Sequence, residues 1–178
     1  MSSKIASVYC NPVLFCGRTI RAFYSEYSFA TLLLDQDEVV AFTTEEVVVG
    51  RWFEVFPICD YKLPSDYVTA WVDLEEPIEV VSSAQVWREE WQEAAADDGK
   101  FMGAGPHSTQ YAAALGQSPE SSTDAVEVHA GLKLLGRDGR ALIVCSSDNT
   151  PFKIDLAVDV QDIERIMHFH TCMPEISS

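Results

Sequence analysis

The first half of the chain consists of short apolar and aromatic runs that turn residues interrupt every few positions. Runs of this length, rich in Val, Ile, Thr, Phe, Tyr and Trp, are typical of β-strands. Their separators, such as Cys16-Gly17, Val49-Gly50 and Glu76-Pro77, favour turns. We expect strands at 5–9, 19–24, 28–34, 38–43, 46–49, 52–58, 67–73 and 78–81. The spacing predicts an antiparallel sheet, either a meander or a partly closed barrel.

Residues 83–97 show a different pattern, because no Gly or Pro interrupts them and Ser82 or Ser83 can cap a helix. At about 100° per residue, Ala84, Trp87 and Trp91 share one helical stripe. Four acids gather on another stripe: Glu89, Glu90, Glu93 and Asp97. The pattern predicts a mid-chain helix at about 83–97, with its tryptophans toward the sheet or a partner and its acids toward water.

The last third of the chain carries clear local signals. The segment Gly136-Arg137-Asp138-Gly139 separates two apolar runs, and its Asp-Gly pair favours a hairpin turn. Residues 152–158 alternate between apolar and polar side chains, as a half-buried strand does. Asp159 can cap a short helix at about 160–169. The predicted class is therefore α+β, a mainly antiparallel sheet packed by one mid-chain and one C-terminal helix.

Size and composition favour one folded unit. A chain of 178 residues with 47% hydrophobic residues suits a single globular domain at 1–178. The Gly-rich and Pro-rich stretch 99–124 is interrupted too often for regular structure, so we expect a long flexible surface excursion there. The chain has no run of 18 apolar residues, and its first residues lack the apolar core of a signal peptide. These features favour a cytoplasmic protein without a membrane segment.

The acidic charge is concentrated between residues 35 and 98. That window holds 17 Asp and Glu against three Lys and Arg, and it accounts for −14 of the net charge of −16. Such a chain repels phosphates, which argues against direct nucleic-acid binding. It attracts a basic partner and speeds the encounter. Acidity that only keeps the protein soluble is the alternative interpretation.

Our leading hypothesis is an acidic protein-binding module, of the immunity or inhibitor type, that neutralises a basic partner such as a nuclease-type toxin. Aromatic anchors next to charges favour binding interfaces, and tryptophans accompany the acids here. The predicted partner-binding residues are Asp73, Glu75, Glu76, Glu89, Glu90, Glu93, Asp97 and Asp98.

No catalytic motif supports an enzyme, so we assign no catalytic residue, no cofactor and no metal. The sequence His168-Phe169-His170-Thr171-Cys172 has metal-ligand residue types, but its spacing matches no established zinc site. The second hypothesis is a small enzyme or ligand-binding domain. Its pocket would lie between the sheet and the 99–124 segment, with His107 or His129 near the mouth.

Overall fold

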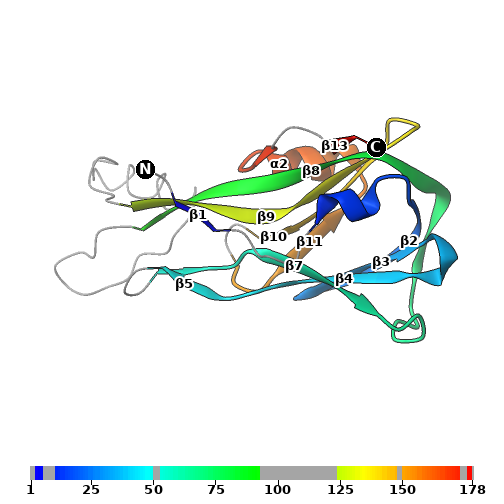
Figure 1. Cartoon of the computed structure of the whole chain (residues 1–178), viewed down its shortest axis with the longest axis horizontal. Helices are drawn as coiled ribbons and strands as arrows, with labels where there is room; N and C mark the ends of the chain where they lie inside the picture. The colour runs from blue at the N-terminus through cyan, green and yellow to red at the C-terminus, as the bar shows by residue number, and fades with distance from the viewer. Residues whose placement is uncertain are drawn as a thin grey trace.

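The fold is described from a computed structural model, which covers residues 3–5, 11–49, 53–92, 124–147, 150–172 and 176–177. Strands make up most of this part of the chain (Figure 1). The strands are β1 (Ser3–Ile5), β2 (Thr19–Glu26), β3 (Phe29–Leu34), β4 (Val39–Thr44), β5 (Val47–Val49), β6 (Phe53–Val55), β7 (Ile58–Leu63), β8 (Val72–Gln92), β9 (Asp124–Gly136), β10 (Ala141–Ser146), β11 (Ile154–Ala157), β12 (Thr171–Cys172) and β13 (Ile176–Ser177). The helical segments are η1 (Pro12–Phe15), η2 (Asp35–Asp37) and α2 (Val160–Met167).

The main sheet has the strand order β11-β10-β9-β8-β2-β3-β4-β7, with each neighbouring pair antiparallel. Strand β8 belongs to both halves, because its first part pairs with β2 and its longer second part pairs with β9. Figure 1 shows β8 to β11 in one layer and β2, β3, β4 and β7 in a second layer beneath it, with β8 bending from one to the other. The sheet therefore folds over on itself.

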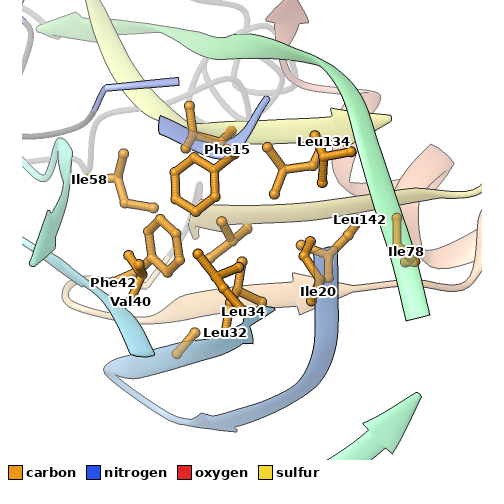
Figure 2. Close-up of a cluster of buried hydrophobic side chains, with 14 of the residues drawn as sticks. Phe15, Ile20, Leu32, Leu34, Val40, Phe42, Ile58, Ile78, Leu134 and Leu142 are labelled. Atoms are coloured by element: carbon orange, nitrogen blue, oxygen red, sulfur yellow. The ribbon is translucent and has the colours of Figure 1, made fainter. Parts of the chain in front are cut away.

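The hydrophobic core lies between these two layers. Phe42 comes from β4 and Leu134 from β9, and Figure 2 shows their side chains in the same cluster. Phe15 of η1 stacks on Phe42 with ring centroids 5.9 Å apart. Burying each Leu, Ile or Phe side chain contributes about 1.5–3 kcal/mol. The core thus fixes the layers against each other and leaves the outer face of the β2–β7 layer for other contacts.

The predicted mid-chain helix is wrong. Residues 83–92 continue strand β8, which pairs with β9 from Val80 to Gln92. Both faces of β8 are covered from Ser83 to Arg88: Val86 packs in a cluster with Ile163 of α2, and Ser83 donates a hydrogen bond to the carbonyl oxygen of Pro12. A strand covered on both faces lacks clean alternation of apolar and polar residues. Its sequence can therefore imitate a helical stripe, and the α+β class with two packing helices gives way to a mostly antiparallel β fold.

The local signals of the C-terminal third are confirmed. Strands β9 and β10 form the predicted hairpin, and Gly139 adopts φ +85 in its turn. The side chain of Asp159 accepts hydrogen bonds from the backbone N–H groups of Gln161 and Asp162 at the start of α2. This helix is the single α-helix among the described residues, and none of the helices there could span a bilayer. The predicted excursion at 99–124 lies outside the described residues, apart from Asp124 at the start of β9.

Candidate functional site

A row of four residues crosses the β2–β7 layer on the face away from the core. Register pairs Tyr24 with Thr31, Thr31 with Ala41 and Ala41 with Tyr61, which places their side chains on one face of β2, β3, β4 and β7. Thr31 and Ala41 are small and fully buried, whereas the two tyrosines stand at the ends of the row. Two large side chains around two small ones leave a depression over the middle strands.

The segment 64–71 covers this depression. It leaves β7 at one edge of the layer and must reach β8 next to β2, so it crosses β4, β3 and β2. A turn in which the N–H of Tyr67 donates to the carbonyl oxygen of Pro64 at 3.1 Å starts the crossing. Val68 is then only 7% exposed, so it anchors the segment on the sheet. The ring centroid of Tyr67 lies 6.3 Å from that of Phe29 on β3.

A cavity of about 300 Å³ lies between the sheet and this segment. Four aromatic side chains and one carboxylate are among its lining residues, which are Tyr24, Glu26, Phe29, Tyr61, Tyr67, Val68, Thr69 and Ala70. Its volume is at the lower end of the range for ligand pockets, roughly 300–1,000 Å³. The cavity is open to solvent, since Glu26 and Tyr67 are exposed. It can admit one side chain or a small ion.

The electrostatics of the cavity favour positive charge. The hydroxyl of Tyr24 donates a hydrogen bond to Glu26 Oε1, which raises the pKa of Tyr24. Burial raises the pKa of Tyr61, and the neighbouring Tyr67 and Cys59 add to this effect. Both phenols are therefore neutral at pH 7, and their ring faces carry the negative side of the aromatic quadrupole. No Lys or Arg belongs to the described lining, so the carboxylate of Glu26 has no competing cation there.

Three of the predicted partner-binding acids lie close together beside this site. The pairing of β2 with β8 steps from Ile20–Ile78 to Ala22–Asp73, so β8 uses more residues than β2 and residues 74–77 form a bulge. Asp73, Glu75 and Glu76 are all exposed on this bulged stretch. It begins a few residues after Ala70, which lines the cavity. The structure therefore adds an acidic ridge, Asp73 to Glu76, to the neighbourhood of the cavity.

The other predicted acids do not join that ridge. Glu89 is exposed but lies at the far end of β8, where it pairs with Glu127 of β9. The expectation that Glu90 faces water is wrong, because it is 5% exposed and its carboxylate binds the buried Arg88. Glu93, Asp97 and Asp98 lie outside the described residues.

The ion pairs of the described residues show which acids keep their charge uncompensated. Nearly every Lys or Arg side chain that the structure describes is already bound to an acid of the chain, namely Arg18, Arg21, Lys62, Arg88, Arg137, Arg140, Lys153 and Arg165. Among the described residues, no cation pairs with Asp73, Glu75, Glu76 or Glu26. The acids of the ridge and Glu26 therefore carry uncompensated negative charge, as do exposed acids elsewhere such as Glu45 and Glu54.

The histidines named in the sequence do not form a site with one another. His129 is 1% exposed and stacks on Trp87, with ring centroids 5.2 Å apart. His168 is exposed, whereas His170 points Nε2 at Arg88 Nη1, 3.3 Å away. Over the described ranges, no group of three metal-ligand side chains converges. His107 and the pocket predicted beside 99–124 lie outside the described residues, while the cavity that is observed lies across the β2–β7 layer.

The sequence prediction missed the residues that line the cavity. The predicted strand ends at Tyr24, but β2 continues to Glu26, so the two side chains face the same side of the sheet. Their approach to Tyr61 and Tyr67 depends on strand order, which no local pattern contains. Comparison with protein-family models, with curated proteins and with solved structures finds no match for this chain.

Proposed function

We propose that the protein is an acidic binding module of the immunity or inhibitor type, which holds and neutralises a basic protein partner such as a nuclease-type toxin. The observation that carries the proposal is the acidic ridge: Asp73, Glu75 and Glu76 are exposed, and no Lys or Arg in the described part of the chain pairs with them. Acids that no cation of the same chain neutralises produce a negative electrostatic potential, which attracts a basic partner.

The arrangement suits protein recognition in two respects. Long-range attraction from the ridge speeds the encounter with a basic surface, and aromatic side chains next to it supply the contact area that interfaces use. A protein whose acids served only solubility needs no such grouping beside an aromatic cavity. We place the interaction in the cytoplasm as part of the same proposal. In support, Cys59 is a thiol that shares a hydrogen bond with Thr43 Oγ1 at 3.1 Å, as a reducing compartment allows.

The test is capture of a partner from the native lysate at low and high salt, followed by assay of the captured protein. The variant Asp73→Asn/Glu75→Gln/Glu76→Gln removes the ridge. The matched control Glu45→Gln/Glu46→Gln/Glu54→Gln removes equal charge at exposed acids away from it. We expect a basic protein, whose own activity the wild type and the control inhibit and the ridge variant does not.

Two results would overturn the proposal. One is recovery of no basic protein at either salt concentration. The other is equal capture by the ridge variant and the wild type, because the charge would then act only on solubility. Screening of exposed charges predicts that capture weakens as the ionic strength rises.

A further inference from the structure

We infer that the cavity between segment 64–71 and the β2–β7 layer is a cation-binding site, which receives the side chain of one Arg or Lys of the basic partner. The inference rests on the proposed function for the source of the cation. The cavity itself supplies the chemistry, since four aromatic side chains and one carboxylate line it.

The first step of the argument is the composition of the walls. Tyr24, Tyr61, Tyr67 and Phe29 approach the space from three strands and the covering segment. A cation within about 6 Å of an aromatic ring centroid is attracted to the ring face, and Arg uses this contact most often. The rings thus add an attraction for a cation that a neutral ligand of the same shape lacks.

The second step is the carboxylate. Glu26 lines the cavity, accepts a hydrogen bond from Tyr24 and is paired with no described cation. It can therefore accept a hydrogen bond from a guanidinium or an ammonium group. Asp66 is exposed in the covering segment, and the ridge of Asp73, Glu75 and Glu76 follows it. These exposed acids come shortly before and after the lining residues 67–70 in the chain, and they add negative charge to this part of the surface.

The third step is size. A volume of about 300 Å³ suits one long side chain or a small organic cation and is too small for a dinucleotide. A side chain carried on a partner reaches the cavity while its neighbours contact the ridge. A basic protein thus satisfies both features at once, whereas a free small cation would use only the cavity.

The experiment measures binding of small probes by NMR, from the shifts of tyrosine ring signals and from saturation transfer to the probe. The cationic probes are N-acetyl-arginine amide and N-acetyl-lysine amide. Each is compared at matched ionic strength with a neutral analogue, N-acetyl-citrulline amide or N-acetyl-norleucine amide. Choline and its neutral isostere 3,3-dimethyl-1-butanol form a separate arm for a free small cation.

We expect both cationic amides to bind at least about fivefold more tightly than their neutral analogues, which corresponds to about 1 kcal/mol. Tyr67→Ala and Glu26→Gln should each weaken binding of the cationic probe, while Tyr67→Phe should retain it. The matched control is Tyr27→Ala. Tyr27 is exposed to a similar extent, 61% against 64% for Tyr67, but does not line the cavity.

Equal binding of charged and neutral probes would overturn the inference, and so would loss of binding in Tyr27→Ala alone. If choline binds far more tightly than either amide, the inferred ligand, a side chain of the partner, is wrong. The ligand would then be a free small molecule with an ammonium group. The probes bind without a partner, so a negative result with them does not affect the capture experiment that tests the proposed function. If no partner is captured, binding of the cationic probes to the cavity can still be measured.

Discussion

Arg88 and Glu90 form a buried ion pair on one face of β8, with Arg88 Nη2 lying 2.6 Å from Glu90 Oε1. Their side chains are 1% and 7% exposed. The guanidinium also donates through Nη1 to the carbonyl oxygen of Ser146 at 2.8 Å and lies 3.3 Å from His170 Nε2. The ring of His170 reaches the carbonyl oxygen of Ile166 through Nδ1 at 2.6 Å. One charged group thus connects β8, β10 and the chain after α2.

Glu90→Gln should destabilise the fold by about 3–5 kcal/mol, because the buried guanidinium of Arg88 would lose its counter-charge. Urea unfolding monitored by tryptophan fluorescence measures the change. The control is Glu89→Gln at the neighbouring exposed position, for which we expect a change within about 0.5 kcal/mol. Similar stability of the two variants would show that the Arg88–Glu90 pair contributes little.

Protonation of His129 should make stability depend on pH. Burial lowers the pKa of His129 from 6.5 to about 4. A hydrogen bond with the backbone of Gly131 raises the pKa, but this effect is smaller. The unfolded chain therefore binds a proton at higher pH than the folded chain does. This contribution to stability is complete above about pH 7 and is lost as the pH falls from 6.5 toward 4, with about 2 kcal/mol gone at pH 5.

Unfolding free energies of the wild type and His129→Gln between pH 7.5 and 5 measure this effect. The difference between the two proteins should change by about 2 kcal/mol over that range. His168→Gln, at an exposed histidine after α2, is the matched control and should follow the wild type. A parallel course for wild type and His129→Gln would contradict the buried neutral imidazole.

Gly131→Ala should prevent normal pairing of β9 with β10. A Cβ at Gly131 would lie 2.1 Å from the carbonyl oxygen of Val144 and 2.5 Å from Cys145 Cβ. The strands must separate to admit it, so we expect a loss of about 3 kcal/mol or more. Gly139→Ala is the control: φ there is +85 but nothing lies within 4 Å, and the expected cost is about 1 kcal/mol. Thermal unfolding of both variants measures these losses. Equal unfolding temperatures for Gly131→Ala and Gly139→Ala would contradict the prediction.

Arg140→Lys should loosen the contact between the β9–β10 turn and the acidic ridge. The guanidinium donates to the carbonyl oxygens of Glu76 at 2.9 Å and Pro77 at 3.0 Å, and also binds Asp138. The ammonium group of a lysine cannot make all of these hydrogen bonds at once. We therefore expect the free energy of unfolding to fall by about 1 kcal/mol and partner capture to weaken. Arg165→Lys, in an exposed pair on α2, should leave both measurements unchanged. Unfolding and capture assays on the two variants separate these outcomes.

Sequence reasoning anticipated much of the secondary structure but little of the site. It located most strands within a few residues, but residues 67–71 of the strand expected at 67–73 are irregular, and β7 (Ile58–Leu63) was not expected beyond residue 58. It was wrong about residues 83–92, where a strand covered on both faces has a helix-like pattern. It also missed the cavity, because Tyr24 and Tyr61 approach one another only through the register of four strands.

The sequence by itself determined the features that depend on neighbouring residues: the turn at Asp138-Gly139, the cap at Asp159 and the excess of acids. Tertiary structure alone decided that β8 runs through both layers, that Glu90 is buried beside Arg88, and that segment 64–71 forms a cavity with Tyr24 and Tyr61. The physical reason is distance along the chain. Turns and caps form from hydrogen bonds between adjacent residues, whereas strand order and burial follow from packing between segments that are far apart in sequence.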